Sequence, residues 1–320
     1  MDVTKQSLKK QLGKSFDDRW LSLYRYAIPN VDLTNYIPDD YFYCHVDPVF
    51  SKPRTAKIID DKNLYDLLFY DAKRPKTVVR LNKGIILDRK YNMIDIDKAL
   101  AICKNSNNLI FKPVSYSSGG RGILFWDANK DTEQELKDLL CLKNVTYVVQ
   151  EIVSQHEVLS RIHKESLNTI RLMTLLWKNE VIVLSSVLRM GSGGSRVDNV
   201  SSGGMACGIL PDGRLKDDAY DGMFNRHEEH PQAGRFGQYI IPNFDKCIEL
   251  VKNLAPRVEE FSKMIGWDIA IDESGEPLLI EANLTFQELD FHQLCNGPIF
   301  GSMTTEIMTY VKSNNRKKLE

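Results

Sequence analysis

Two acidic residues that could hold a metal ion lie in the stretch WDIAIDESGEPLLIEAN, residues 267–283. Its pattern of apolar and polar residues predicts two strands joined by a short Glu-Ser-Gly-Glu turn. We expect Asp272 to pair with Pro277 across that turn. This register places Asp268 directly opposite Glu281. The apolar face of the hairpin then carries Trp267, Ile269, Ile271, Leu278, Ile280 and Ala282. The sequence therefore predicts a hairpin with one face in the core and one acidic face.

The acidic face of this hairpin predicts a divalent cation. Directly opposed Cβ atoms lie ~4.5–5.5 Å apart, where two carboxylates repel each other unless positive charge lies between them. Mg²⁺ prefers oxygen ligands and combines one or two carboxylates with water and substrate phosphates. We therefore predict a metal site formed by Asp268, Glu281 and Asn283, and we expect metal removal to raise the pKa of the carboxylate pair. A solvated acidic hairpin edge is the alternative interpretation.

A cluster of small residues follows a β-like run in FKPVSYSSGGRG, residues 111–122. The cluster consists of Ser117, Ser118, Gly119 and Gly120. Small residues let backbone N–H groups approach phosphate oxygens, and the ammonium of Lys112 adds a point charge. The loop is not a Walker loop, because its lysine precedes the glycines. An ordinary hairpin turn explains it equally well, and the same two interpretations stay open for the loop NVSSGGM at residues 199–205.

The scaffold that must position these residues is predicted to mix helices and strands. Residues 1–59 begin with a basic amphipathic helix pattern, and residues 60–150 alternate helical with β-like runs such as NLIFKPV and VTYVVQEIV. Residues 151–320 are dominated by strands, including NTIRLMTLLW and EVIVLSSVLRM, and a helix is expected from Asp245 to Met264. The predicted fold class is α+β or α/β, with these three segments as its domains.

Composition narrows the class of protein. The 320 residues are 42% hydrophobic and 27% charged, which is typical of a soluble enzyme with a sizeable core. Forty-two basic and 43 acidic side chains give no broad electropositive surface for nucleic acid. The six cysteines form no C-x-x-C pair, so we expect reduced thiols. No signal peptide and no run of ~20 apolar residues is present, so we expect no membrane span and a cytoplasmic location.

The order of these motifs resembles that of ATP-grasp proteins. Lys112, the glycine loop and then Asp268 and Glu281-Ala282-Asn283 follow one another as in that family. The text NTIRLMTL, DNVSSGG and WDIAI is similar to the sugar-transfer-associated subgroup, which tends to accompany surface-polysaccharide biosynthesis. The resemblance covers about residues 60 to 310. It implies an ATP-grasp fold, in which two α+β subdomains clasp ATP, preceded here by a helical amino-terminal segment.

The resemblance also implies roles for individual residues. Lys112 and Lys62 would contact ATP phosphates, the loop at 117–122 would act as a lid, and Arg171 would serve the transferred phosphoryl group. Arg196 resembles the arginine of an Arg…Asn-x-x-x-Gly-Gly element. The catalytic residues would be Arg171 and Lys112. The nucleotide would be bound by Lys62, Lys112, Ser117, Ser118, Gly119, Gly120, Gln150, Glu151, Val153, Glu157 and Asn199, and Mg²⁺ by Asp268, Glu281 and Asn283.

The activity implied is that of an ATP-dependent carboxylate–amine ligase with Mg²⁺, or Mn²⁺ in its place. Its partners would be a small-molecule carboxylate and an amine, with a uronic acid or an amino acid as the carboxylate, linked to sugar metabolism. Two alternatives stay open: a kinase that phosphorylates a hydroxyl, and a nonenzymatic nucleotide-binding module. A zinc hydrolase is disfavoured, because His227 and His230 lack a third ligand at a recognisable spacing and their stretch is predicted to be an exposed loop. His292 and Gln293 are expected to pack in the core or at the surface more than to face substrate.

Overall fold

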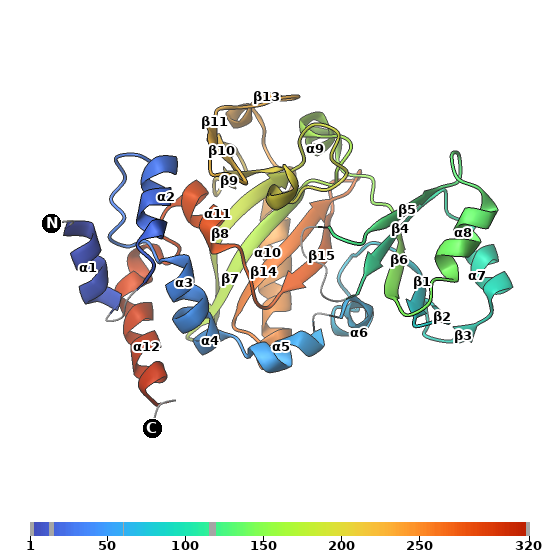
Figure 1. Ribbon diagram of the computed structural model, residues 1–320, viewed down its shortest axis with the longest axis horizontal. Coiled ribbons are helices and arrows are strands. Elements are labelled where there is room, and N and C mark those ends of the chain that lie inside the picture. Colours follow the sequence, from blue (N-terminus) through green and yellow to red (C-terminus); the bar gives the residue numbers. More distant parts are fainter. Residues whose placement is uncertain (1–2, 13–15, 60, 115–119, 318–320) are drawn as a thin grey trace.

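The computed structural model describes residues 3–12, 16–59, 61–114 and 120–317. This part of the chain contains two large antiparallel sheets, of six and seven strands, and a two-stranded ribbon (Figure 1). Helices cover the faces of the sheets and gather at one end, where the two chain termini lie (Figure 1). The predicted α+β class is therefore confirmed. No helix in the described ranges is both long enough and apolar enough to cross a bilayer.

The six-stranded sheet carries the glycine-loop region. In spatial order its strands are β3 (Met93–Ile94), β2 (Ile85–Asp88), β1 (Thr77–Asn82), β6 (Thr146–Glu151), β4 (Asn108–Pro113) and β5 (Leu124–Asp127). The helices α7 (Ile96–Cys103) and α8 (Glu133–Leu140) pack on it and share one core with its apolar residues. Asp95 caps the first helix, and Thr132 forms a capping box with Glu135 in the second, so both helices begin where their sequence directs.

The seven-stranded sheet carries the acidic hairpin at its edge. In spatial order its strands are β11 (Arg226–His227), β10 (Leu215–Asp221), β9 (Met205–Ile209), β8 (Glu180–Met190), β7 (Thr169–Trp177), β14 (Met264–Ile271) and β15 (Pro277–Asn283). The ribbon pairs β12 (Glu229–His230) with β13 (Gly234–Arg235). One face packs on α10 (Phe244–Leu254) and α9 (Glu157–Ile162), and the other on α11 (Leu289–Asn296) and the amino-terminal helices. Because both faces are covered, β14 is buried along its whole length.

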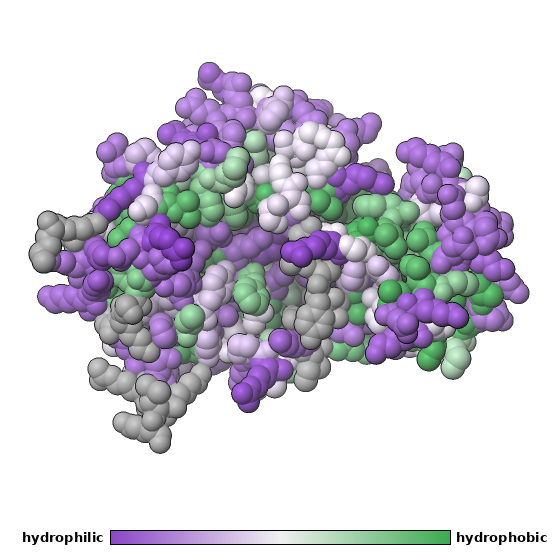
Figure 2. Space-filling model, viewed as in Figure 1, coloured by the Kyte–Doolittle hydropathy of each residue, from purple (hydrophilic) through white to green (hydrophobic). Residues whose placement is uncertain are grey.

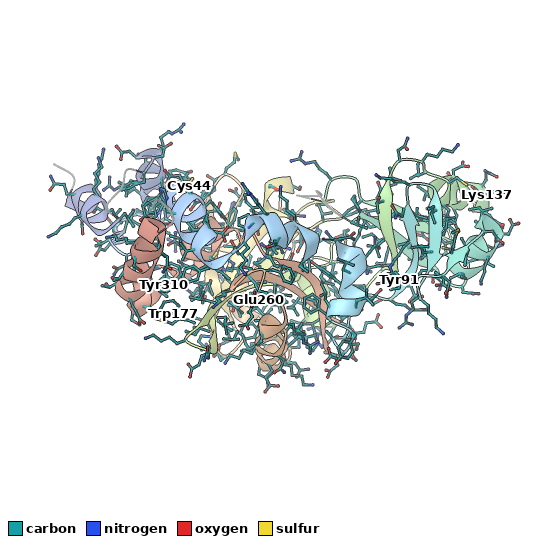
Figure 3. All side chains as sticks on the ribbon, turned by 90° about the horizontal axis from the view of Figure 1, so that it is seen from below. Cys44, Tyr91, Lys137, Trp177, Glu260 and Tyr310 are labelled. Carbon is teal, nitrogen blue, oxygen red and sulfur yellow. The ribbon has the colours of Figure 1, made fainter. Side chains whose placement is uncertain are left out.

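Both ends of the chain build the helical end of the molecule. Its members are α1 (Val3–Leu12), α2 (Arg19–Ala27), α3 (Asp39–Tyr41), the π-helix η1 (Phe42–Val46), α4 (Asp47–Phe50) and α12 (Thr304–Lys317). Leu8, Leu12 and Phe16, which repeat at helical spacing, are buried there. Trp177 and Tyr310 lie at this end, whereas Lys137 lies at the far end of the six-stranded sheet (Figure 3). The connection to that sheet runs through α5 (Pro53–Ile59), the short 3₁₀ turn η2 (Lys62–Leu64) and α6 (Tyr65–Leu68).

The helix expected from Asp245 to Met264 is too long. α10 ends at Leu254, the 3₁₀ turn η5 (Ala255–Val258) follows, and Met264 already begins β14. Pro256 explains the break, because proline has no N–H to donate and its ring obstructs the preceding helical turn. The remaining 3₁₀ turns are η3 (Val200–Ser202), η4 (Phe236–Gln238) and η6 (Gly301–Met303).

The hairpin of β14 and β15 pairs as predicted at its open end and differs near its turn. Asp268 lies opposite Glu281, but Ile271 pairs with Pro277 where Asp272 was expected to. A bulge after Asp268 shifts the register by one residue, because an extra residue in one strand reverses the alternation beyond it. Leu279 therefore joins the core, whereas Ile280, expected in the core, is half-buried and lines a cavity.

Gln293 anchors the amino-terminal segment to α11. Its fully buried side chain accepts a hydrogen bond from the Ile37 N–H at 2.9 Å and donates one to the Ile37 carbonyl at 2.9 Å. We predict that Gln293→Ala lowers the free energy of unfolding by about 3 kcal/mol, because two buried backbone groups lose their partner. Urea denaturation measures this loss. Gln134→Ala, at an exposed position on α8, should stay within ~0.5 kcal/mol of wild type, and equal losses in both variants would contradict the prediction.

Candidate active site

A cavity of about 620 Å³ lies between the two large sheets. It is lined from one side by β4 and from the other by β7, β8, β14 and β15, together with residues 196–199 and the segment after β15. In the space-filling view, hydrophilic and hydrophobic residues are mixed over the middle of this face, whereas hydrophilic residues dominate its upper edge (Figure 2). The cavity contains most of the charged residues singled out from the sequence.

A buried ion cluster forms one wall of the cavity. Arg171 on β7 donates to Asp268 on β14 through Nε at 2.5 Å and Nη2 at 3.2 Å, and Arg189 on β8 brings Nη2 to 3.0 Å from the same carboxylate. Asp268 and both arginines are at most about 5% exposed. Burial opposes ionisation of Asp268, but the charges of Arg171 and Arg189 outweigh it and lower its pKa. Asp268 is thus a carboxylate held by two guanidinium groups.

Three further residues of this wall, Thr169, Asp198 and Arg189, were not assigned a role from the sequence. Thr169 donates to the buried Asp198 and accepts hydrogen bonds from Arg189, the shorter at 2.9 Å. Burial raises the pKa of Asp198, and the charge of Arg189 offsets only part of this effect. Arg189 itself was missed, although a charged residue inside the apolar run EVIVLSSVLRM is a signal of a paired or functional group.

Glu281 and Asn283 lie on β15 beside Asp268. The ammonium of Lys62 is 2.7 Å from Glu281 Oε1, and Asn283 Nδ2 donates to the Gly266 carbonyl at 3.1 Å. The two opposed carboxylates therefore each have a cationic partner from the protein. We expected metal removal to raise the pKa of the Asp268–Glu281 pair. For Asp268 this is wrong, because Arg171 and Arg189 supply positive charge that we had assigned to a metal alone and lower its pKa.

The oxygen atoms that Glu281 and Asn283 present at the β15 edge of the sheet suit Mg²⁺. Among the described residues, Glu281 Oε2 and Asn283 Oδ1 have no hydrogen-bond partner, whereas both Asp268 oxygens are held by arginines. These donors are all oxygens, as Mg²⁺ prefers. No group of three or more His, Cys, Asp or Glu side chains in the described residues could hold a metal by itself. Phosphate and water oxygens would have to complete the coordination.

Lys112 projects into the cavity from β4, the strand opposite the ion cluster. It is half-buried, and its ammonium makes no hydrogen bond or ion pair with the described part of the chain. Burial, together with the nearby charge of Lys62, lowers the pKa of Lys112 to about 8. A partly desolvated ammonium without a counter-ion is suited to bind an anionic ligand. Lys62 starts η2, where Asp61 accepts a hydrogen bond from the Asn63 N–H.

Gly120, in the loop that was predicted to act as a lid, lies close to Val197. A Cβ on Gly120 would lie 2.9 Å from Val197, so only glycine permits this approach. The guanidinium of Arg196 lies over the ring of Phe125 on β5, 3.6 Å from its centroid. Ser117, Ser118 and Gly119 lie outside the described residues.

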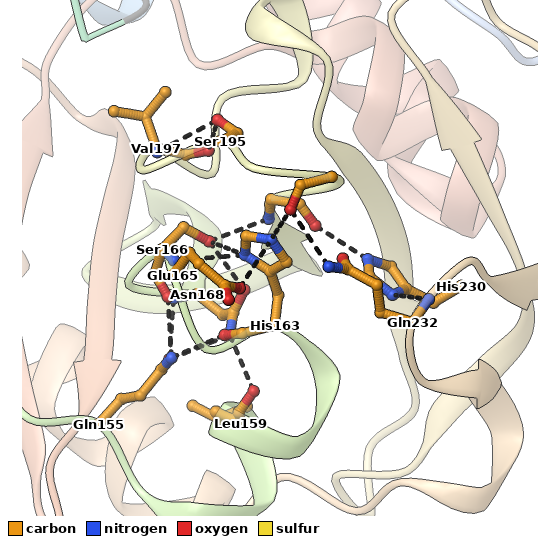
Figure 4. A network of polar contacts seen from close by, with 12 residues as sticks. Gln155, Leu159, His163, Glu165, Ser166, Asn168, Ser195, Val197, His230 and Gln232 are labelled. Carbon is orange, nitrogen blue, oxygen red and sulfur yellow. Dashed lines mark hydrogen bonds and ion pairs between the residues drawn. The ribbon is translucent and has the colours of Figure 1, made fainter.

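A buried polar network holds the loop that carries Arg196, Asp198 and Asn199 to the cavity (Figure 4). His163 Nε2 donates to the Gly193 carbonyl at 3.0 Å, and its Nδ1 lies 2.8 Å from Ser166 Oγ. The loop approaches so closely that a Cβ on residue 191 would lie 2.5 Å from Ser166 Oγ, which requires glycine there. The cavity loop is therefore fixed from behind by side chains that do not face the cavity.

The same network includes His230, the second of the two histidines that were considered as zinc ligands. His230 is buried, contrary to the predicted exposed loop, and donates to the Gly191 carbonyl at 2.8 Å. His227 lies 3.0 Å from Asp221. His292 and Gln293 are both fully buried, as favoured from the sequence.

Gln150, Glu151, Val153 and Glu157, which were predicted to bind the nucleotide, do not line the main cavity. Gln150 lines a small pocket that shares Lys62, Lys112 and Ile280 with it. Glu151 accepts from Lys76 at 2.6 Å, and Val153 lines a surface pocket. Glu157 is exposed at the start of α9 and pairs with Arg161 at 3.2 Å. Of these four residues, only Gln150 lies near Lys62 and Lys112.

Comparisons with known proteins cover most of the chain. The sequence profile of the family described as sugar-transfer associated ATP-grasp matches residues 46–308. A comparison with curated proteins gives no match. Similar solved structures include the ATP-grasp ligase PsnB complexed with minimal precursor, at 13% identity and a TM-score of 0.45, with 81% of this chain and 63% of that chain covered.

Two further structures are similar at the same level. D-cycloserine synthetase DcsG has 13% identity and a TM-score of 0.46, with 80% of this chain and 72% of that chain covered. D-alanyl-alanine synthetase A from Vibrio cholerae has 15% identity and a TM-score of 0.42, with 79% and 63% covered. The chain spans less than two thirds of the length of PsnB and of this synthetase. All these TM-scores lie below 0.5, so the family assignment rests on the profile.

We predict that nucleotide affinity falls as pH rises through about 8, because Lys112 binds phosphate only when protonated. The free energy of unfolding of the apo protein changes in the opposite direction. Because the pKa of Lys112 is lowered in the folded state, the unfolded chain binds more protons between about pH 8 and ~10.4. The apo protein therefore gains stability as pH rises over that range. Calorimetry with Mg²⁺ and ADP from pH 7 to ~9 measures the affinity. Lys112→Arg keeps its charge and should lose most of this dependence. An identical pH profile in both proteins would remove Lys112 from the binding site.

Proposed function

The chain belongs to the sugar-transfer associated ATP-grasp family, and we propose that it is an ATP- and Mg²⁺-dependent ligase that joins a carboxylate to an amine. One observation carries the proposal. A single cavity between the two sheets brings the cations Lys62, Lys112, Arg171 and Arg189 together with the oxygen donors of Glu281 and Asn283. This combination suits phosphoryl transfer, which depends on positioning and on charge stabilisation more than on covalent catalysis by the protein.

The reaction has two steps. A carboxylate oxygen of the acid attacks the γ-phosphorus of ATP, so that the bond to ADP breaks and an acyl phosphate forms. The amine then attacks the acyl carbon, phosphate leaves with the electron pair of the C–O bond, and loss of a proton from nitrogen gives the amide. Mg²⁺, when bound, would neutralise phosphate charge and orient the phosphates.

The residues of the chain have separate parts in this scheme. Lys112, from β4, and Lys62, from η2, would contact the ATP phosphates. Arg171, fixed by Asp268, would stabilise the charge that develops on the transferred phosphoryl group. The glycine lid would exclude water from the acyl phosphate, which otherwise hydrolyses. Glu281 and Asn283 would hold the metal, with Asp268 beside them, where it accepts from Asn283 Nδ2 at 3.4 Å.

The positions and pKa values of the cysteine thiols argue against a covalent intermediate on cysteine. None of the six cysteines, all of which lie in the described residues, lines the cavity. Burial raises the pKa values of Cys103, Cys207 and Cys247 to about 12, so these thiols stay protonated. A covalent thioester route is therefore disfavoured.

Finer statements rest on the family description and on the sequence. We propose a sugar acid, such as a uronic acid, or an amino acid as the carboxylate substrate, with a sugar-linked amine and a role in surface-polysaccharide biosynthesis in the cytoplasm. Mn²⁺ could replace Mg²⁺. Residues 60–150 would form the subdomain with the lid, residues 151–320 the subdomain with the metal ligands, and residues 1–59 the helical amino-terminal segment.

The test of this function is product analysis with the full chain, Mg²⁺ and ATP. We expect ADP and phosphate with a uronic acid or amino acid only when an amine is present, and an amide as the product. Mass spectrometry identifies the product and a coupled assay measures ADP. A stable phosphorylated product that forms without any amine would instead establish the kinase alternative. No ADP formation across a panel of acids and amines would contradict both enzymatic functions.

Removal of the Glu281 charge tests the metal site. We predict that Mg²⁺ with a nonhydrolysable ATP analogue raises the melting temperature of wild type but not that of Glu281→Gln, because ligand binding stabilises only a folded state that can hold it. Without ligand, Glu281→Gln should melt slightly below wild type, since Lys62 loses its partner at 2.7 Å and lies near Lys112. Equal ligand-dependent shifts in both proteins would show that Glu281 is structural.

A further inference from the structure

We propose that the acid substrate binds where the carboxylate of Glu288 now lies, with its carboxylate on Arg171 and Arg189 and a ring or similar nonpolar body against Phe286. Glu288 would thus occupy the acceptor subsite until substrate displaces it. This inference rests on the proposed ligase function, because it locates the acid within the same cavity. Neither Glu288 nor Phe286 was assigned a role from the sequence.

The two arginines present matching nitrogens to one carboxylate oxygen. Glu288 Oε2 lies 3.2 Å from Arg171 Nη1 and 3.3 Å from Arg189 Nη1. Other nitrogens of the same side chains are engaged with Asp268 on β14. The Nη1 atoms are therefore the ones left for an incoming anion. Two guanidinium groups can hold the carboxylate of an acid substrate through charge-assisted hydrogen bonds and fix its position for reaction.

The arginines are fixed, and the carboxylate between them is the part that can move. The side chains of Arg171 and Arg189 are 5% and 6% exposed, whereas that of Glu288 is 36% exposed. Glu288 has φ of 62° and Phe286 has φ of 59°, so two non-glycine residues adopt the left-handed conformation within three positions. A change to ordinary backbone angles would release this strain and withdraw the carboxylate.

Glu288 is also in the ionic state that competes with a substrate carboxylate. Burial opposes its ionisation, but the charges of Arg171 and Arg189 outweigh this and lower the pKa of Glu288. At neutral pH it is therefore an anion on the two arginines. An acid substrate must exchange with it, which makes the apparent affinity of the site depend on residue 288.

Phe286 shapes the space next to this carboxylate. Its ring lines the cavity yet is 73% exposed, an unusual position for a large aromatic side chain. The ring of Tyr43 supports it at 5.6 Å between centroids, and the Tyr43 hydroxyl accepts from the Leu289 N–H at 3.3 Å. Tyr43 belongs to η1, so the amino-terminal segment contributes to this wall. The uncovered face suits the C–H face of a pyranose ring, such as that of a uronic acid.

The experiment compares small probes on the full-length chain at constant ionic strength. Acetate carries the carboxylate without a ring, D-glucuronate carries both, and D-glucose carries the ring without the carboxylate. Glu288→Gln removes the competing charge at nearly constant size. Glu288→Asp is a second variant that keeps the charge but is one methylene too short to reach both arginines. Glu249→Gln, at an exposed position on α10, is the matched control. Calorimetry measures affinity, and thermal melts confirm that each variant folds.

We expect acetate and D-glucuronate to bind Glu288→Gln at least about tenfold more tightly than wild type or Glu249→Gln, because a charge-assisted contact no longer competes. Glu288→Asp should show a smaller gain, and D-glucose should show none. Phe286→Ala should weaken D-glucuronate severalfold and leave acetate unchanged.

Three results would overturn parts of the proposal. Equal acetate affinity in wild type, Glu288→Gln and Glu288→Asp would show that Glu288 does not occupy an anion site. Loss of anion binding in Glu288→Gln would make Glu288 a ligand for the metal or for the substrate. D-glucuronate binding unaffected by Phe286→Ala would remove the ring platform. These experiments measure binding, so they can be interpreted even if the protein shows no ligase turnover. If the protein is shown to be a ligase but Glu288→Gln gains no affinity for acetate, only the present inference is contradicted and the proposed function stands.

Discussion

The buried pairing of Asp268 with Arg171 and Arg189 is the interaction on which the rest of the site depends. It joins three adjacent strands, β8, β7 and β14, in the middle of the seven-stranded sheet. Removal of one partner from such a buried ion pair typically costs ~3–5 kcal/mol, because the remaining charge is left uncompensated. The same pairing leaves the outer nitrogens of both arginines facing the cavity. Asp268, Arg171 and Arg189 therefore both stabilise the sheet and shape the charge of the cavity.

The other parts of the cavity are arranged around this cluster. β15 sets Glu281 next to Asp268, where Lys62 reaches it from the start of η2. The six-stranded sheet brings Lys112 from the opposite side. The network around His163 fixes the loop that carries Asp198, without placing its own members in the cavity. Positive charge is thus distributed along the cavity, enough for phosphates and for a substrate carboxylate, with acidic side chains that keep the arginines ionised.

Sequence patterns predicted the parts of the fold that depend on local periodicity. The strand EVIVLSSVLRM was located within its observed bounds, Glu180–Met190. The pairing of Asp268 with Glu281 was predicted from an expected Asp272–Pro277 pair at the turn, and it is present although that turn pair is not, because the bulge shifts the register between them. The bulge beyond that pair could not be predicted, because it depends on how both neighbouring strands pack. Glu288 was missed for a similar reason: only the folded chain brings it to Arg171 and Arg189, which lie 117 and 99 residues before it in the sequence. The domain limits and the nucleotide-binding roles of Gln150, Glu151, Val153 and Glu157 stay predictions.

The most direct measurement is the electron density of a crystal grown with Mg²⁺ and a nonhydrolysable ATP analogue. The account predicts phosphates in contact with Lys112, a metal held by Glu281 and Asn283, and Asp268 still bound by both arginines. A metal ligated by Asp268 after its bonds to Arg171 have broken, or a nucleotide bound outside the cavity between the two sheets, would contradict it.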